Sequence, residues 1–376
     1  MKNNSGMTFD FMSAGRIIFG IGVLKKLQDI SFISQKNILI FEGSPSKNTK
    51  RVHEILDSIR IKYETYQIHG EPNLGMISNA RNAAKFADVI IAVGGGSVID
   101  TGKAVSALIT NAGEVSDYLE IVGQGNPLLK PSLPFIAIPT TSGTGSEVTK
   151  NAVINIPEYR VKVSLRHEYL LPNVAIIDPE LTISLPKQIT AFSGMDALTQ
   201  VIEPFVSNRA NIFTDSLCKA AIKKASTALK LAYDNGKNIQ AREDMAWVSV
   251  CGGIALANAG LGAVHGFAGP IGGMFNAPHG AVCAKLLPSV VATNINASRL
   301  AGLSITLEKF QEIENISQQD LCSQLNCSSE EYYKLALCRA PDTDSTEFIN
   351  RLNNIGQYIG ISVFSLSSMI KRVNSI

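Results

Sequence analysis

Two histidines of this chain lie in a segment with few other polar side chains. His265 and His279 stand 14 residues apart in "VHGFAGPIGGMFNAPHG", and residues 245–284 contain no Asp, Glu, Lys or Arg. The whole chain holds only five histidines. Because neutral imidazole is the commonest metal ligand in proteins, metal coordination is one interpretation of this pair. Burial as two hydrogen-bonded core histidines is the other.

An aspartate upstream favours the metal interpretation. Asp196 and Gln200 in "SGMDALTQVIEP" are four residues apart, so they share one face of a predicted helix. Asp196 has apolar neighbours, where an unpaired carboxylate is costly, and it therefore needs a cation. One carboxylate and two imidazoles suit Zn²⁺ or Fe²⁺ and leave a position open for a substrate oxygen.

A glycine-rich turn follows the predicted strand in "DVIIAVGGGSVIDTGK". Three glycines precede a helix that we expect to begin near Ser97, and helix N-terminal amides freed of Cβ bulk bind phosphate. A tight turn that needs positive φ is the alternative interpretation. The dinucleotide pattern Gly-x-Gly-x-x-Gly is absent because Ile99 replaces its third glycine, and the Walker pattern fails because Ala104 follows Lys103.

A second polar loop, "PTTSGTGSEVTKNAVI" at residues 139–154, follows the predicted strand "FIAI". Hydroxyl groups at the carboxyl end of a parallel strand can donate to phosphates, ribose and a flat ring. A solvated Ser/Thr loop is the alternative. Two such loops on adjoining strand ends favour a dinucleotide.

The elements that must position these residues change character along the chain. Short β-branched runs alternate with amphipathic stretches in the first half, which indicates a doubly wound, mostly parallel sheet. We predict strands at residues 37–43, 62–70, 88–96, 134–143 and 174–182, and helices at 48–60 and 77–86.

Sequence patterns typical of strands stop after about residue 185. We therefore place the boundary between the two halves at Asp178 to Pro186. The remainder predicts helices, several of them opened by Ser or Asp and ended by Gly. We therefore expect an α/β dinucleotide-binding domain at 1–183 and an all-α domain for metal and substrate at 184–376. The predicted helices span 184–207, 210–236, 241–260 and 344–360.

The amino-acid composition limits the classes of partner that we expect for this protein. The 376 residues carry a net charge of +2 from 34 basic and 32 acidic side chains, which gives no long-range field to attract nucleic acid or an anionic membrane. Nine glycines and two prolines interrupt the uncharged run 245–284, so a buried helix pair is favoured over a membrane span. Six cysteines without a Cys-x-x-Cys pair, and an N-terminus without an apolar signal core, favour a cytoplasmic protein with reduced thiols.

Taken together, the motifs resemble the iron-containing (group III) alcohol dehydrogenases, which are relatives of glycerol dehydrogenase and dehydroquinate synthase. The similarity extends from about Thr8 to at least Val291 and implies a dehydroquinate synthase-like fold with a divalent metal and NAD(P). Four segments match the family signatures in order: "GGGSVIDTGK", "PTTSGTGSEVT", "GMDALTQVIEP" and "GAVHGFAGPIGGMFNAPHG".

The resemblance also implies roles for particular residues. Those implied for the cofactor are Gly95, Gly96 and Ser97 at the pyrophosphate with Asp100 nearby, Thr140, Thr141 and Thr144 at the ribose and nicotinamide, and Lys162 and Asn73 beside the nucleotide. Those implied for the metal are Asp196, Gln200, His265 and His279.

Two positions depart from the family pattern. Gln200 stands where the family has a histidine, and an amide oxygen is a poorer ligand for Zn²⁺ or Fe²⁺ than imidazole. A site with Asp196, His265 and His279 would favour zinc over iron or bind weakly. Gly269 replaces a second histidine and removes a polar group from the expected substrate pocket.

The resulting hypothesis is hydride transfer from NAD(P)H to the carbonyl carbon of a small aldehyde, or the reverse reaction from the corresponding alcohol. A metal would polarise the substrate oxygen. A metal-independent reductase similar to maleylacetate reductases and a dinucleotide-binding protein without turnover are the alternatives. NAD or NADP depends on whether Glu42 or Gly43 occupies the position of the ribose-binding carboxylate. We also expect a homodimer, with residues 10–22 supplying an edge strand.

Overall fold

The computed structural model describes residues 8–300, 310–311, 314–328, 348–359, 366–367 and 370. By compactness the chain divides into two units, residues 1–287 and 288–376. The strands, the first helices of the second half and all predicted site residues belong to the first unit. Within it, the last strand ends at Ile177, and the first helix of the helical half begins at Lys187. The change from strands to helices therefore lies close to the predicted position. A domain boundary at 183 stays a prediction.

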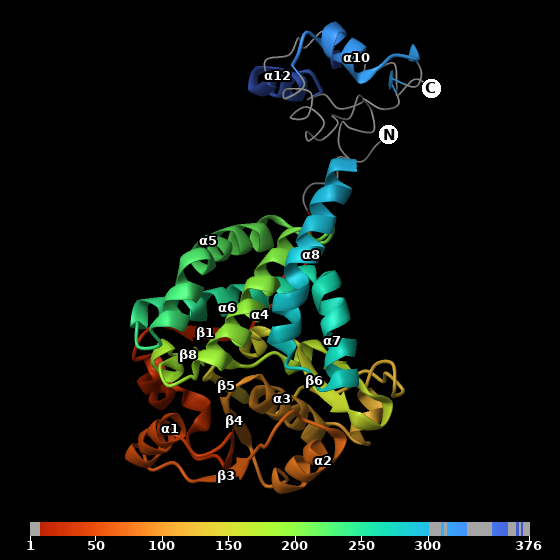
Figure 1. Ribbon diagram of the computed structural model, residues 1–376. Helices are drawn as coiled ribbons and strands as arrows, with labels where there is room; N and C mark the ends of the chain where they lie inside the picture. The colour runs from red at the N-terminus through yellow and green to blue at the C-terminus, as the bar shows by residue number, and fades with distance from the viewer. Residues whose placement is uncertain are drawn as a thin grey trace. The chain divides into compact units, whose positions relative to one another are not determined.

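A six-stranded parallel sheet forms the centre of the first unit (Figure 1). Its order is β1-β8-β5-β4-β2-β3, and every neighbouring pair is parallel. The doubly wound fold is therefore confirmed, and all strands end at the same edge of the sheet. The strands are β1 (Arg16–Phe19), β2 (Ile38–Glu42), β3 (Tyr63–Gln67), β4 (Val89–Gly94), β5 (Phe135–Pro139) and β8 (Val174–Ile177).

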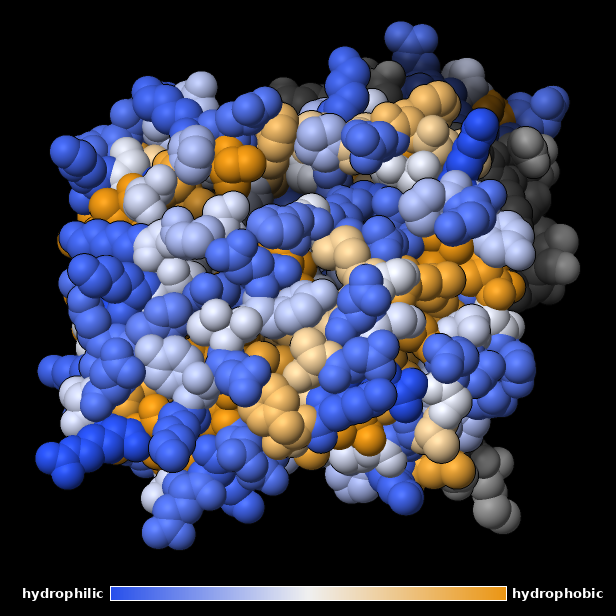
Figure 2. Space-filling view, turned by 90° about the horizontal axis from the view of Figure 1, so that it is seen from below, coloured by the Kyte–Doolittle hydropathy of each residue, from blue (hydrophilic) through white to orange (hydrophobic). Residues whose placement is uncertain are grey.

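Helices cover both faces of this sheet. On one face the core includes residues of α2 (Leu74–Ala83) and α3 (Gly96–Thr110), and on the other it includes α1 (Lys47–Ser58). Strands β2, β4 and β5 are buried along their whole length because both of their faces are covered. Seen from the side of α1 and α2, polar residues dominate the surface and apolar residues form small groups (Figure 2).

One insertion breaks the expected alternation of strand and helix. Strands β6 (Asn151–Ile156) and β7 (Val161–Arg166) form an antiparallel hairpin between β5 and β8. The prediction of strict alternation is wrong here. The residues of β6 alternate between buried and more exposed, as expected of a hairpin with one covered face, and Arg160 adopts a left-handed conformation (φ 53°) at the turn.

The second half is helical, as predicted. Alanines of α5 pack against α4 and α6 in a core of small side chains, which lets the three helices approach closely. The helices of this half are α4 (Lys187–Phe205), α5 (Ile212–Asp234), α6 (Ile239–Ala259), α7 (Ala263–Phe275) and α8 (His279–Leu300), and the second unit contains α10 (Gln318–Leu325) and α12 (Phe348–Ile359).

The uncharged run corresponds mainly to α6 and α7. Among the described residues, no single helix is long and apolar enough to cross a membrane. Only α6 and α7 taken together meet that test of length and composition, and the pair is bent by 100°. Most of α6 is buried inside the first unit, as predicted. Helix α7 buries only Val264, Ala268 and Gly272 and leaves the apolar side chains of Phe267, Met274 and Phe275 exposed, so the prediction of a buried pair is wrong for α7.

Candidate metal and cofactor site

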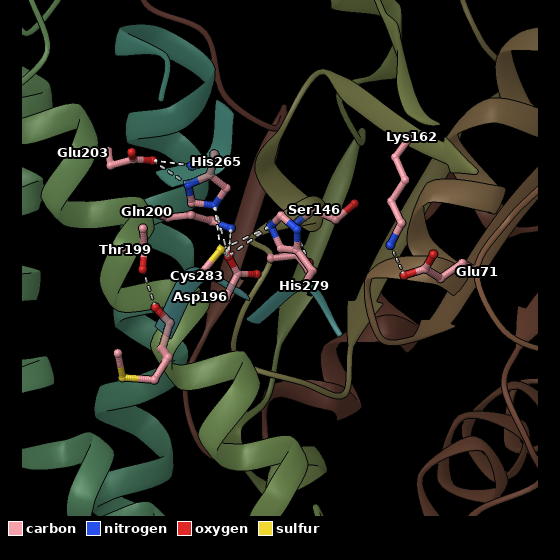
Figure 3. A network of polar contacts seen from close by, with 12 residues as sticks. Glu71, Ser146, Lys162, Asp196, Thr199, Gln200, Glu203, His265, His279 and Cys283 are labelled. Carbon is pink, nitrogen blue, oxygen red and sulfur yellow. Dashed lines mark hydrogen bonds and ion pairs between the residues drawn. The ribbon is translucent and has the colours of Figure 1, made fainter. Parts of the chain in front are cut away.

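Three helices bring the predicted metal ligands together. Asp196 lies on α4, His265 on α7, and His279 is the first residue of α8 (Figure 3). Cys283, one turn further along α8, joins them. Each of these four residues offers one ligand atom, and the four atoms lie within 4.8 Å of one another.

The contacts centre on one oxygen of a buried carboxylate. Asp196 is 3% exposed, and its Oδ1 lies 3.1 Å from Nε2 of His265 and 3.6 Å from Nε2 of His279. Gln200 donates its amide Nε2 to the same oxygen at 3.1 Å. Gln200 is thus part of the site, but in this arrangement it presents a donor to Asp196 and not a ligand oxygen.

The orientation of His265 is fixed from its other side. Oε2 of Glu203, on α4, lies 2.6 Å from Nδ1 of His265, while Oε1 accepts a hydrogen bond from the backbone of Val264 at 2.7 Å. A buried carboxylate at Nδ1 holds the proton there, which leaves Nε2 to face Asp196. A Cβ atom at Gly262 would lie 2.8 Å from Glu203 Oε1, so this contact needs a glycine.

Neighbouring charges and hydrogen bonds in the cluster shift the pKa values of its members. Burial opposes ionisation of Asp196, but the hydrogen bond from His265 and the charge of His279 outweigh it and lower the pKa of Asp196. Burial likewise opposes protonation of His265, yet its contacts with Asp196, Cys283 and Glu203 raise its pKa well above the usual value. The pKa of the Cys283 thiol is lowered despite its burial, by hydrogen bonds with His265 and His279. These shifts favour an ionised Asp196 and an ionised Cys283 beside protonated histidines or a metal ion.

Sequence reasoning overlooked two members of this group, Glu203 and Cys283. Both carried a usable signal. Cys283 follows His279 by four residues, and Glu203 follows Gln200 by three, so each shares a helix face with a predicted ligand. From the sequence, Cys283 is interpreted only as one of the scattered cysteines and Glu203 only as part of a helix.

The glycine turn and the Thr-rich loop lie against each other. Gly95 caps α3, and a Cβ atom at Gly96 would lie 2.8 Å from Cγ2 of Thr144. Gly95 has φ −78°, and the turn contains no glycine of positive φ, so the alternative interpretation of a positive-φ turn is wrong. The glycines are needed instead for the close approach of strand end, helix and loop. Ser97, Thr140 and Thr141 are partly exposed and Thr144 is exposed, which leaves them accessible to a ligand.

The Thr-rich loop also contacts α4, which carries Asp196, and α6. A Cβ atom at Gly143 would lie 2.7 Å from Cβ of Ser193, three residues before Asp196 on α4. Gly145 has φ 58°, and its Cβ would lie 2.6 Å from Cα of Gly253 on α6. The loop therefore connects the glycine turn directly to the helices around Asp196.

The remaining predicted cofactor residues have structural partners. Asp100 accepts hydrogen bonds from Ser146 and from the backbone of Val153 and lies 3.3 Å from the buried Lys103. Lys162, on β7, pairs with Glu71 at 2.6 Å, beside the cluster in Figure 3. Asn73 caps α2 by accepting a hydrogen bond from Met76.

The two residues at the end of β2, Glu42 and Gly43, have different surroundings. Glu42 is buried, and its Oε2 lies 3.3 Å from Nε2 of His53 on α1. Gly43 is the next residue, and a Cβ atom there would be 3.9 Å from Val98 on α3. The residue that faces the glycine turn therefore has no carboxylate.

Comparison with known proteins agrees with this geometry. Residues 14–179 match the family model "Iron-containing alcohol dehydrogenase", and residues 190–357 match the model of the C-terminal part of Fe-containing alcohol dehydrogenases. The chain is 40% identical over 298 residues to long-chain-alcohol dehydrogenase 1 of Geobacillus thermodenitrificans, an alignment that covers 74% of this chain and 73% of the relative.

Solved structures show the same fold. An alcohol dehydrogenase from Oenococcus oeni aligns with a TM-score of 0.73 and 30% identity, over 95% of this chain and 88% of that one. A sulfoacetaldehyde reductase from Bifidobacterium kashiwanohense in complex with NAD+ aligns with a TM-score of 0.70 and 25% identity, over 98% and 86% of the two chains.

The contact between Glu203 and His265 yields a first prediction. Glu203→Gln keeps the shape of the side chain but removes the charge that holds the Nδ1 proton, so we expect metal affinity to fall roughly 10- to 100-fold. Titration of the metal-free protein with Zn²⁺ against a chromophoric chelator measures this. Glu54→Gln, on the exposed side of α1, is the matched control and should leave the affinity unchanged. Equal affinities for the two variants would show that Glu203 does not position His265.

Proposed function

We propose that three residues of this chain, which belongs to the iron-containing alcohol dehydrogenase family, hold the divalent metal of its active site: Asp196, His265 and His279. The chain is an oxidoreductase that acts on CH–OH groups, and its family uses NAD(H) and iron or another divalent metal. The observation that supports the assignment is the convergence of these donors within 4.8 Å, with Asp196 buried and the two histidines partly buried. A metal-free reductase would have little reason to keep this set of donors together.

The donor set fits a divalent ion on chemical grounds. A buried carboxylate faced by two imidazole nitrogens needs positive charge, which either protonated histidines or a metal supplies. When bound, such an ion polarises the C–O bond of the substrate while the nicotinamide exchanges a hydride with its carbon. Glu203 holds the ring of His265 in place for that role, and Gln200 orients Asp196.

The nucleotide is assigned to the glycine turn and the Thr-rich loop. Helix α3 begins at Gly96 and has no acidic residue in its first turn, so its N-terminal amides remain available to a pyrophosphate. Gly95, Gly96 and Ser97 form that cradle. The hydroxyls of Thr140, Thr141 and Thr144 lie beside it, on the loop that contacts α4, which supports a cofactor whose reactive end lies toward Asp196. Asp100, by contrast, holds Ser146 and the hairpin together.

The substrate is assigned to the class of small alcohols and aldehydes. Gly269 lies on α7 one turn after His265, and a Cβ atom there would meet nothing within 4 Å. This open space supports a pocket that accepts a bulkier substrate. A proton released from the alcohol would leave through water, since position 269 carries no side chain to accept it.

The central experiment compares metal content with turnover. We expect purified protein to contain about one equivalent of metal per chain and to oxidise NADH or NADPH with aliphatic aldehydes, in a manner abolished by a chelator. Asp196→Asn and His279→Ala should lose both metal and activity. Asp234→Asn, at the exposed end of α5, is the control. Equal metal content in all four proteins, measured by elemental analysis, would refute the site.

The end of β2 leads to a prediction about the phosphate of the cofactor. Gly43 leaves room for a 2′-phosphate, and α1 begins four residues later without an acidic residue in its first turn. We expect NADPH to be used at least as well as NADH, and Gly43→Asp to shift the ratio of kcat/KM values toward NADH by about tenfold or more. A side chain fits at this position, since a Cβ there is in ordinary contact with Val98.

The control for this prediction is Glu42→Gln. The Glu42 carboxylate faces His53, so its removal should leave the cofactor ratio unchanged. A ratio that responds to Glu42→Gln but not to Gly43→Asp would assign ribose recognition to Glu42.

The homodimer and the cytoplasmic location also remain proposals. Strand β1 lies at the edge of the sheet and exposes Ile17 (36%), which supports pairing with a second copy through this strand. We expect light scattering to give twice the chain mass, and Ile17→Lys to shift the protein toward a monomer, whereas Val153→Lys on β6 should not. A monomer at all concentrations would contradict the dimer.

The cytoplasmic location is supported by the cysteines. Those at positions 218, 251, 283 and 322 are free thiols, consistent with a reducing compartment.

A further inference from the structure

The metal cluster contains a sulfur donor in addition to its three proposed ligands. Cys283 is fully buried on α8, and its Sγ lies 3.7 Å from Nε2 of His279 and 3.9 Å from Nε2 of His265. The same sulfur lies 4.0 Å from Oδ1 of Asp196. Its neighbours at the site are thus the three donor atoms themselves.

The separations of the sulfur and of the carboxylate oxygen from the two imidazole nitrogens are close to those of a tetrahedral zinc site. With Zn–N bonds of about 2.0–2.1 Å and Zn–S bonds of about 2.3 Å, tetrahedral geometry separates nitrogen from sulfur by roughly 3.6 Å and oxygen from nitrogen by roughly 3.4 Å. The N···S distances of 3.7 and 3.9 Å and the O···N distances of 3.1 and 3.6 Å lie within a few tenths of these values. Small side-chain shifts would complete the coordination.

Gln200 is the competing candidate for the fourth position, and its surroundings argue against it. Its Nε2 donates to Oδ1 of Asp196 at 3.1 Å, so a ligand role for its oxygen would require the amide to turn and give up this hydrogen bond. Its Oε1 is buried without a hydrogen-bond partner and lies close to Gly252 on α6, where a Cβ would be 3.5 Å from it. As placed, the amide presents a donor and not a ligand oxygen to Asp196.

We propose that the thiolate of Cys283 is the fourth protein ligand of the metal, in the place left by the missing histidine at Gln200, and that the site consequently selects zinc over iron. This inference rests on the proposed function, since it concerns the same metal. A thiolate is a soft ligand that suits Zn²⁺, whereas a site with only oxygen and imidazole ligands accepts Fe²⁺ more readily. Binding releases the thiol proton to solvent, and neither metal nor sulfur changes oxidation state.

Cobalt reports directly on the sulfur ligand. Metal-free full-length protein is titrated with Co²⁺ under anaerobic conditions, and the absorption spectrum is recorded. We expect visible ligand-field bands together with a near-ultraviolet sulfur-to-cobalt charge-transfer band. Cys283→Ser should lose the charge-transfer band and keep ligand-field bands from the two histidines. Cys251→Ser, a buried cysteine in the alanine-rich core of α6, should keep both.

The outcomes separate this inference from the proposed function. Protein that binds cobalt without the charge-transfer band, or a Cys283→Ser variant that retains it, overturns Cys283 as a ligand and leaves the three-ligand site intact. Wild-type protein that binds no cobalt overturns both.

X-ray absorption of the zinc-loaded wild-type protein needs no variant to fold. One sulfur at about 2.3 Å beside nitrogen or oxygen at about 2.0–2.1 Å is expected, and a shell of light atoms alone would refute the inference. Competition between Zn²⁺ and Fe²⁺ tests the metal preference. We expect the preference for zinc to be smaller in Cys283→Ser than in Cys251→Ser, and an unchanged preference would refute the selection of zinc.

Discussion

The burial of one carboxylate constrains much of the helical half. Asp196 lies in a layer of helices whose neighbouring core is mostly alanine, and it is almost completely enclosed. Removing the groups that compensate a buried charge typically costs several kcal/mol, so positive charge must lie against it in every state of the protein. Protonated imidazoles of His265 and His279 provide that charge when metal is absent. In the proposed metal site, the same three side chains become ligands when a divalent ion replaces the protons.

This convergence requires helices α7 and α8 to approach α4 more closely than ordinary side chains allow. A Cβ atom at Gly280 would overlap the carbonyl oxygen of Phe192 on α4, and one at Gly262 would crowd the carboxylate of Glu203. On the far side of α7, Gly273 lies against the backbone of Arg160, where a Cβ would come within 2.6 Å of its oxygen. Gly262 and Gly280 thus have a shared physical purpose. They bring imidazoles within bonding distance of an aspartate more than 60 residues away in the sequence.

The nucleotide loops and the metal cluster form one continuous structure. Three glycines allow close contacts of the Thr-rich loop: Gly96 with Thr144, Gly143 with Ser193 and Gly145 with Gly253. The loop is therefore held between α3 on one side and α4 and α6 on the other. A displacement of this loop would therefore move both the cofactor cradle and the helix that bears Asp196. Such rigid support is what hydride transfer requires, since the donor and acceptor carbons must be held at a fixed separation.

Local patterns in the sequence determined the parallel strands and the long helices, because alternation and helical periodicity reflect which face of each element is buried. They also singled out Asp196, His265 and His279, which the structure brings together, and the glycine turn and the Thr-rich loop, which lie against each other. Tertiary structure alone decided the rest. The hairpin of β6 and β7 and the reason for the glycine turn depend on packing between distant segments. The assignment of Gln200 as a donor, and the meeting of Glu203 and Cys283 with the histidines, depend on how three helices pack to within a few ångströms, which no single helix encodes.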